Sequence, residues 1–404
     1  MSEPSPRHAP LGFRGFVVIV ALLMGLNALA IDIMLPALPD MGRAFTLDDP
    51  NRAQNVLVLY LAGFGAGQLL VGVLADRFGR KPVLLAGLVG YGLAALACVL
   101  APDFATLLAA RFVQGMASAA PRVVSVAIVR DCYSGRRMAQ VMSLSMTVFM
   151  VVPVLAPAIG QAILLVAPWE AVFIVLALYA AAMFWACTTR LPETLAPEDR
   201  RPIRLARIVE ALGSILRVRQ TVGYMLAAGV FLGALFGFVT SAQQVMGEVL
   251  GLGRLFPLAF ALCALSIALS SLVNAALVER LGMRLLSHGA VLAATIIAAL
   301  MLALGEGAGL WGYLALQSAL MLMVGLTFSN FNALAMEPQG HVAGMASAVT
   351  GTVTVLMGAG IGHVIGQAFD GTTAPLGTGY LACGLGTLGI LLVTERGRLF
   401  SRAA

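Results

Sequence analysis

Long apolar runs follow one another along most of this sequence, with short polar stretches between them. A helix needs roughly 20 apolar residues to cross a bilayer core about 30 Å thick. The runs are continuous rather than alternating, which excludes a membrane β-barrel. Twelve spanning helices are therefore expected, at about residues 16–39, 53–75, 82–101, 104–129, 138–166, 169–189, 221–246, 255–278, 285–304, 309–335, 343–369 and 374–394.

The composition agrees with a polytopic membrane protein and narrows its chemistry. Hydrophobic residues make up 60% of the chain and charged residues only 11%, against about 25% charged in soluble proteins. Motifs of the GxxxxGK[ST] and HExxH types do not occur in the sequence, which argues against ATP-driven transport and hydrolysis. The five cysteines suit neither a disulfide nor a metal site. We expect no enzyme activity, no cofactor and no metal.

The net charge of +6 reflects membrane topology rather than nucleic-acid binding. One side of the predicted membrane carries only Arg43, Arg52 and Arg254 between spans. The loops, termini and linker on the other side carry Arg7, Arg14, Arg77, Arg80, Lys81, Arg130, Arg136, Arg137, Arg190, Arg200, Arg201, Arg204, Arg207, Arg217, Arg219, Arg280, Arg284, Arg396, Arg398 and Arg402. Because basic residues gather in cytoplasmic loops, both termini and the linker are expected in the cytoplasm.

Two ten-residue segments show that the two halves of the chain repeat one pattern. GVLADRFGRK (72–81) and AALVERLGMR (275–284) match at Asp76 and Glu279, 203 positions apart, each after the second span of its half. Ala28-Leu29-Ala30 resembles a signal-peptide cleavage site, but removing the first span would leave five helices against six. The expected organisation is a cytoplasmic tail 1–15, a six-helix bundle 16–189, a cytoplasmic linker 190–220, a second bundle 221–394 and a cytoplasmic tail 395–404.

The linker between the halves is rich in arginine and proline. Part of it, 203–217, has the pattern of an amphipathic helix that lies on the anionic inner leaflet. A plain solvated tether is an equally good interpretation.

A single carboxylate stands inside the first apolar run, in the stretch NALAIDIMLPALPD (27–40). Pro36 has no N–H, so it leaves the carbonyl of Asp32 without its helical partner and predicts a bend there. An ionisable group within the membrane is a functional candidate by default. The alternative is that Asp32 only caps the outer end of the first helix.

The fourth run carries two arginines on nearly one helix face. In LLAARFVQGMASAA (107–120), Arg111 and Gln114 are three apart and share a face, and Gly115 follows them. Arg122 comes eleven residues after Arg111, close to three turns and about 16 Å along the axis. We expect Asp32 to pair with one of these two arginines. If depth in the membrane decides the pairing, Arg122 is favoured over Arg111. The alternative is that both arginines bond the backbone structurally.

The loop segment GVLADRFGRK has a physical interpretation of its own. Gly72 favours close helix contact and Gly79 a tight turn, while Asp76 suits a helix N-terminus. The alternative is that its charges only enforce topology. In the fifth run, Pro153 and Pro157 are four apart and predict a bend, with Gly160 after them.

Polar and flexible residues elsewhere are candidates for lining a cavity. They are Asn27, Met34, Met116, Met146, Met150, Gln243, Asn330 and His363. Methionine adapts to varied ligands, and an intramembrane amide is more often a helix–helix hydrogen-bonder than a ligand contact. His363 lies beside Gly358, Gly362 and Gly366, where a packed neutral histidine is the better interpretation.

These motifs resemble the major facilitator superfamily. GVLADRFGRK is similar to its signature between helices 2 and 3, with Gly72, Asp76, Arg77, Gly79, Arg80 and Lys81 as a gating motif and Arg130 as the matching basic residue on helix 4. Arg111, Gln114 and Gly115 resemble the R-x-x-Q-G signature of proton-coupled antiporters. Pro153, Pro157 and Gly160 match the helix 5 antiporter signature in part, because Val152, Ala156 and Gln161 replace three of its glycines.

A closer resemblance, over about 15–398, is to the bicyclomycin and chloramphenicol resistance (Bcr/CflA) exporters. It rests on the run around Asp32, on AIVRD (127–131), LPET (191–194) and NFNALAMEPQGHVAG (330–344), with Glu170 where relatives have arginine. The resemblance implies an all-α membrane protein of twelve helices in two six-helix pseudo-twofold halves. It also implies a bacterial inner membrane location, a monomer, and coupling through Asp32, Arg111 and Arg122.

The function expected on these grounds is proton-coupled export of drugs or similar small amphipathic molecules by alternating access. The partners are then a small-molecule substrate, protons and the lipid bilayer, without nucleic acid. The alternatives are a proton-coupled exporter of an endogenous metabolite such as an amino acid derivative, a uniporter or importer, and a membrane sensor without transport.

Overall fold

The computed structural model describes residues 11–200 and 205–400, and the regular elements in this part of the chain are all helices. Within it, twelve stretches are long and apolar enough to cross a membrane, as the sequence predicts. The first of them runs over Phe13–Ala44, longer than expected, because a 3₁₀ turn (Leu35–Ala37) and α2 (Leu38–Ala44) continue from α1 (Phe13–Asp32). Arg7, Arg201, Arg204 and Arg402 lie outside the described residues.

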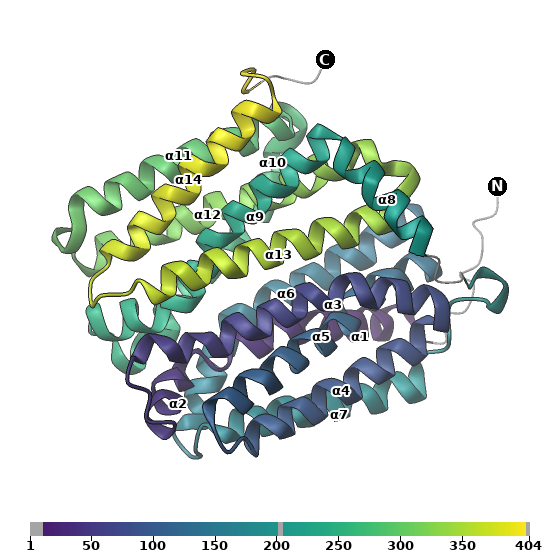
Figure 1. Ribbon diagram of the computed structural model, residues 1–404, viewed down its shortest axis with the longest axis horizontal. Coiled ribbons are helices and arrows are strands. Elements are labelled where there is room, and N and C mark those ends of the chain that lie inside the picture. The colour runs from purple at the N-terminus through teal and green to yellow at the C-terminus, as the bar shows by residue number, and fades with distance from the viewer. Residues whose placement is uncertain (1–10, 201–204, 401–404) are drawn as a thin grey trace. The chain divides into compact units, whose positions relative to one another are not determined.

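The chain divides into two compact units (Figure 1). The first takes the residues up to Met34 and Leu59–Leu205, and the second takes Leu35–Val58 and the residues from Ala206 onward. The sequence-based division assigns 35–58 to the first half. In the structure this outer segment packs with the second unit, because Asn51 and Gln54 hydrogen-bond to side chains there.

The first unit is built from α1 and five further long helices: α3 (Asn55–Phe78), α4 (Arg80–Val99), α5 (Phe104–Cys132), α6 (Gly135–Leu164) and α7 (Glu170–Arg190). α1 packs against α5 and α6, while α4 packs against α5 and lies alongside α7 (Figure 1). α6 continues without interruption through Pro153 and Pro157, and α5 does so through Pro121.

The second unit is built from α9 (Arg219–Ala242), α10 (Phe256–Leu281), α11 (Met283–Leu304), α12 (Gly309–Met336), α13 (Ala343–Gln367) and α14 (Ala374–Thr394). α9 lies against α12, α13 and α14, and its neighbour α13 is visible beside it in Figure 1. A π-helical turn, Gln243–Val249, extends α9 at its outer end. Such turns interrupt regular helices and are frequent at functional sites.

The linker forms the helix that its pattern predicts. α8 covers Leu205–Arg217, within the expected 203–217. Its exposed side chains include Leu216, which is 57% exposed, and Arg217.

Candidate functional site

Arg111 is fully buried in the middle of the first unit. Its guanidinium donates to Gln114 Oε1 at 2.6 Å on the same helix and to the carbonyl of Ala30 on α1 at 3.3 Å. The Cζ atom also lies 4.2 Å from the centre of the Tyr60 ring, within the range of a cation–π contact. The predicted shared face of Arg111 and Gln114 is confirmed by their hydrogen bond.

Tyr60 extends this contact to a polar cluster on three helices. Its hydroxyl donates to Asn27 Oδ1 at 3.0 Å, and Ser118 Oγ lies 3.3 Å from the same oxygen. Asn27, an expected cavity residue, is thus a hydrogen-bond acceptor between α1, α3 and α5. Tyr60 and Ser118 are functional candidates that sequence reasoning missed, because a tyrosine and a serine in apolar runs carry no distinguishing pattern.

Gly115 has a packing role that its motif alone does not reveal. A Cβ atom placed on Gly115 would lie 2.0 Å from the backbone oxygen of Tyr60, and one on Gly63 would lie 2.0 Å from the backbone oxygen of Phe112. Small residues allow this close approach of helix backbones. The glycines therefore fix the position of Tyr60 relative to Arg111.

Asp32 is the last residue of α1 and is only 5% exposed. The 3₁₀ turn at Leu35–Ala37 follows it, so the break predicted from Pro36 is confirmed. Within residues 11–200 and 205–400, its carboxylate has neither a hydrogen bond nor an ion pair. The N–H of Ile33 bonds to the carbonyl of Leu29 at the helix end, so the Asp32 side chain is not its cap.

The expected ion pair between Asp32 and Arg111 or Arg122 is not formed in this structure. Arg122 is half-buried and has no hydrogen bond or ion pair to any described residue. Arg111, and not Arg122, reaches α1, at Ala30, two residues before Asp32. Arg111 is thus the arginine that contacts the first helix in this structure, and which arginine pairs with Asp32 stays a prediction.

The loop between α3 and α4 forms an ionic network with a different partner from the one expected. Arg80 donates to Asp76 Oδ1 at 2.5 Å and to Asp131 Oδ2 at 3.1 Å. Arg130 is exposed and makes no hydrogen bond or ion pair to Asp76 within the described residues. The residue of α5 that joins the motif is thus Asp131, because its carboxylate complements an arginine of the loop and a second arginine does not.

Glu193, from the segment LPET, binds the start of α4. Its carboxylate accepts the backbone N–H of Arg80 at 2.9 Å and that of Lys81 at 3.2 Å. Gly79 has φ +106°, and a Cβ there would lie 2.4 Å from Glu193 Oε2. The predicted need for glycine at this turn is confirmed. At Gly72 the predicted close contact is not present, since an added Cβ would meet no atom within 4 Å.

The repeat in the second unit has its own glutamate after the last helix. Glu395 accepts from Arg284 Nε at 3.1 Å and from the Tyr224 hydroxyl at 2.6 Å. The same hydroxyl lies 3.1 Å from His288 Nε2. Arg284 aligns with Lys81, so each half ties its loop to the residues that follow its sixth helix.

Three amide side chains bond to one another at the outer end of the second unit, and a fourth bonds to the backbone of one of them. Gln54 donates to Gln244, and Gln244 donates to Asn51 Oδ1 at 2.7 Å. Gln367 donates to the carbonyl of Asn51 at 2.7 Å, and Asn51 donates to that of Phe369 at 2.9 Å. Gln244 is buried, whereas Gln243, the expected cavity residue, is only half-buried.

The other candidates for lining a cavity differ in burial and in hydrogen-bond partners. Asn330 bonds to Asn274 at 2.7 Å between α12 and α10, the helix–helix role that is usual for such amides. His363 is half-buried on α13, and its Nδ1 has no hydrogen-bond partner within the described residues. Met34 is fully buried, while Met116, Met146 and Met150 are half-buried.

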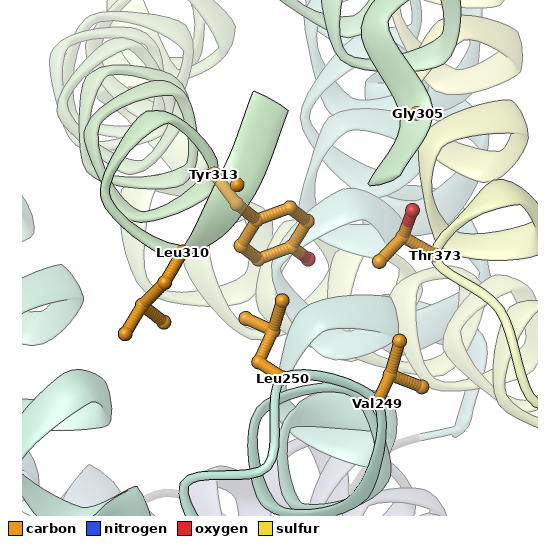
Figure 2. A pocket seen from close by; sticks show the side chains of 7 residues that line it. Val249, Leu250, Gly305, Leu310, Tyr313 and Thr373 are labelled. Atoms are coloured by element: carbon orange, nitrogen blue, oxygen red, sulfur yellow. The ribbon is translucent and has the colours of Figure 1, made fainter. Parts of the chain in front are cut away.

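Two hollows lie within single units. One, of about 250 Å³, is in the second unit, lined by Tyr313, Leu250 and Thr373, with the Tyr313 hydroxyl on the side of Thr373 (Figure 2). The other, of about 640 Å³, is an apolar groove of the first unit bordered by α3, α4 and α5. Met116 is the one expected cavity residue that lines either of them.

Twelve spanning helices in two units, with matching charged loops and a buried acid on the first helix, define a secondary transporter. A family model described as Major Facilitator Superfamily matches residues 20–363. The chain belongs to the major facilitator superfamily and is a transporter, not an enzyme.

Known relatives extend over nearly the whole chain. It is 32% identical to the MFS-type transporter YdgK of Bacillus subtilis, over 92% of this chain and 93% of that protein. It is 31% identical to the bicyclomycin resistance protein homolog of Haemophilus influenzae, over 89% and 91%. The crystal structure of the human organic anion transporter MFSD10 has the same fold, with TM-score 0.66, 20% identity, and coverage of 95% and 99%.

Proposed function

We propose that this transporter exports drugs or similar small amphipathic molecules in exchange for protons. The observation that carries the proposal is Asp32, a buried carboxylate at a helix break with no ionic partner in the described residues. A charge in this position is costly, and such groups mark ion and proton pathways in membrane proteins. A proton that neutralises the carboxylate removes this cost.

In the proposed cycle, a proton from outside neutralises Asp32 and favours outward release of the substrate. Deprotonation toward the cytoplasm resets the transporter. Arg111 contacts the carbonyl of Ala30 near the proton site, while Arg122 is half-buried on the same helix and free to meet substrate. The loop network of Arg80, Asp76 and Asp131 serves as the cytoplasmic gate.

The named relatives support a drug substrate and a bacterial setting. One relative is a bicyclomycin resistance protein homolog, and the multidrug resistance protein MdtL of Escherichia coli is 31% identical over 59% of this chain. We assign the chain to the Bcr/CflA-type exporters of the bacterial cytoplasmic membrane. We also propose that it works as a monomer with both termini in the cytoplasm.

The test uses purified protein in proteoliposomes that contain a pH-sensitive dye. Candidate drugs are first selected by a susceptibility panel in an efflux-deficient bacterial host. Addition of a selected drug is expected to change the internal pH in wild type but not in Asp32→Asn. Asp103→Asn is the control, since Asp103 is an exposed acid at the start of α5. Normal uphill transport by Asp32→Asn would rule out Asp32 as the proton carrier.

A further inference from the structure

Tyr60 lies where three helices of the first unit meet. It belongs to α3 and is completely buried. The face of its ring contacts Arg111 of α5 at 4.2 Å, and its hydroxyl bonds to Asn27 of α1 at 3.0 Å. One side chain therefore links the buried arginine of α5 to the helix that ends at Asp32.

The position of Tyr60 is set by backbone contact and not by its side chain alone. The Tyr60 carbonyl approaches α5 so closely at Gly115 that no Cβ fits between them. A second close approach of α3 and α5 occurs at Gly67, where a Cβ would lie 2.5 Å from the backbone oxygen of Met116. Since backbone contacts of this kind leave little freedom for sliding, the ring is a fixed surface for Arg111.

Arg111 reaches toward the proton site from this surface. Its guanidinium bonds to the carbonyl of Ala30, two residues before Asp32. In an interior of low dielectric, a cation near a carboxylate changes the balance between the charged and neutral forms. The position of Arg111 therefore affects the pH at which Asp32 binds and releases its proton.

We propose that Tyr60 is a positioning residue for proton coupling, whose ring holds Arg111 toward α1 while its hydroxyl holds α1 through Asn27. The proposal rests on the function proposed above, in which Asp32 carries the proton. Ring and hydroxyl have separate tasks: the ring places the cation, and the hydroxyl places the helix.

Other groups that face Arg111 define the control. Tyr91 and Cys98 of α4 lie within its electrostatic reach. Tyr91 is as deeply buried as Tyr60, but its hydroxyl has no hydrogen-bond partner within the described part of the chain. Tyr91→Phe thus removes a buried hydroxyl close to Arg111 without removing a contact.

The experiment follows the protonation of Asp32 without a transported substrate. Full-length protein in detergent is treated with dicyclohexylcarbodiimide, which modifies buried protonated carboxyl groups, over a range of pH. Mass spectrometry of the peptide then gives the fraction of Asp32 modified. The midpoint pH is expected to move by about one unit in Tyr60→Leu, the size of a desolvated cation–π contact. It should move by less than half of that in Tyr60→Phe, and not in Tyr91→Phe.

One further variant makes the result decisive. Asn27→Ala removes the partner of the hydroxyl and should match Tyr60→Phe, which answers the question even if Tyr60→Leu does not fold. Midpoints that coincide with wild type in both Tyr60→Phe and Asn27→Ala would overturn the positioning role, whether or not Tyr60→Leu folds. Failure of the proposed function has a different signature, namely normal drug-driven proton exchange by Asp32→Asn in proteoliposomes.

Discussion

Arg80 and Asp131 are joined by a hydrogen-bonded ion pair of 3.1 Å between the start of α4 and the end of α5. A second guanidinium nitrogen of Arg80, Nη1, bonds to Asp76. Its side chain is only 12% exposed, and that of Asp131 is 20% exposed. One arginine thereby holds the ends of three helices together on the side assigned to the cytoplasm.

Replacing Asp131 is expected to harm the protein more than replacing its neighbour Arg130. Asp131→Asn leaves Arg80 with one carboxylate in a partly buried site, which should cost about 1–3 kcal/mol, less than for a fully buried pair. Arg130→Gln is the matched control, because Arg130 is exposed and should change stability by less than about 0.5 kcal/mol. Thermal unfolding of the purified variants measures the difference. Equal losses in both would mean that the ion pair contributes nothing.

The carboxylate of Glu193 is expected to stabilise the first turn of α4. It accepts two N–H groups that have no partner within the helix. Glu193→Ala should lower stability by about 1 kcal/mol, the usual cost of losing a cap. Glu198→Ala, in the 3₁₀ turn Pro197–Asp199, is the control because Glu198 is exposed. If the two variants unfold at the same temperature, the cap has no energetic role.

The cap of α5 should give a pH-dependent contribution to stability. Asp103 accepts the Thr106 N–H at 2.8 Å, and this bond holds the pKa of the carboxyl below its ordinary value. Because the folded pKa is lowered, the contribution is present above the unfolded pKa, near 4, and is lost as the pH falls through the folded pKa. Asp103→Ala should therefore unfold at a lower temperature than wild type at pH 7. The difference in unfolding temperature between wild type and Asp103→Ala should disappear in acid. Asp103→Asn keeps a hydrogen-bond acceptor at this position, and the contribution of that acceptor to stability should not change with pH.

The fold followed from the sequence because its determinants are local. Apolar length alone predicts the spans, and Pro36 alone predicts the break after Asp32. The packing of residues 35–58 with the second unit was not predictable. It depends on amide pairs such as Gln54 and Gln244, which are 190 positions apart and belong to no recognisable spacing.

The candidate site followed from the sequence only in part. Arg111 and Gln114 share a helix face by simple periodicity, and the structure confirms it. Whether Arg122 or Arg111 pairs with Asp32 stays a prediction, because axial depth does not say how a long side chain turns. Tyr60 and Asp131 were missed because their importance comes from the partners that the fold supplies.

The outer amide cluster should behave as a coupled unit. Asn51→Ala and Gln244→Ala each remove one member of the 2.7 Å bond between them. The double variant should lose less stability than the sum of the two single variants, by about 1 kcal/mol, the net value of a typical hydrogen bond. Thermal unfolding of all four proteins closes the cycle. Gln243→Ala, next to Gln244 but only half-buried, is the control, and additive losses would show that the amides act independently.

The glycines on α3 and α5 provide a stringent test of the close packing that places Tyr60. Gly115→Ala puts a Cβ 2.0 Å from the backbone oxygen of Tyr60, and no side-chain rotation relieves that clash. Overpacking of this kind typically costs about 1–3 kcal/mol. Gly72→Ala is the matched control on α3, since its Cβ would meet nothing within 4 Å. There the replacement should be neutral or slightly stabilising, because alanine favours helix over glycine by about 1 kcal/mol. The unfolding temperature should thus fall for Gly115→Ala, and it should rise or stay unchanged for Gly72→Ala. A Gly115→Ala protein as stable as wild type would mean that α3 and α5 are further apart than described, and that the ring of Tyr60 is not fixed against Arg111.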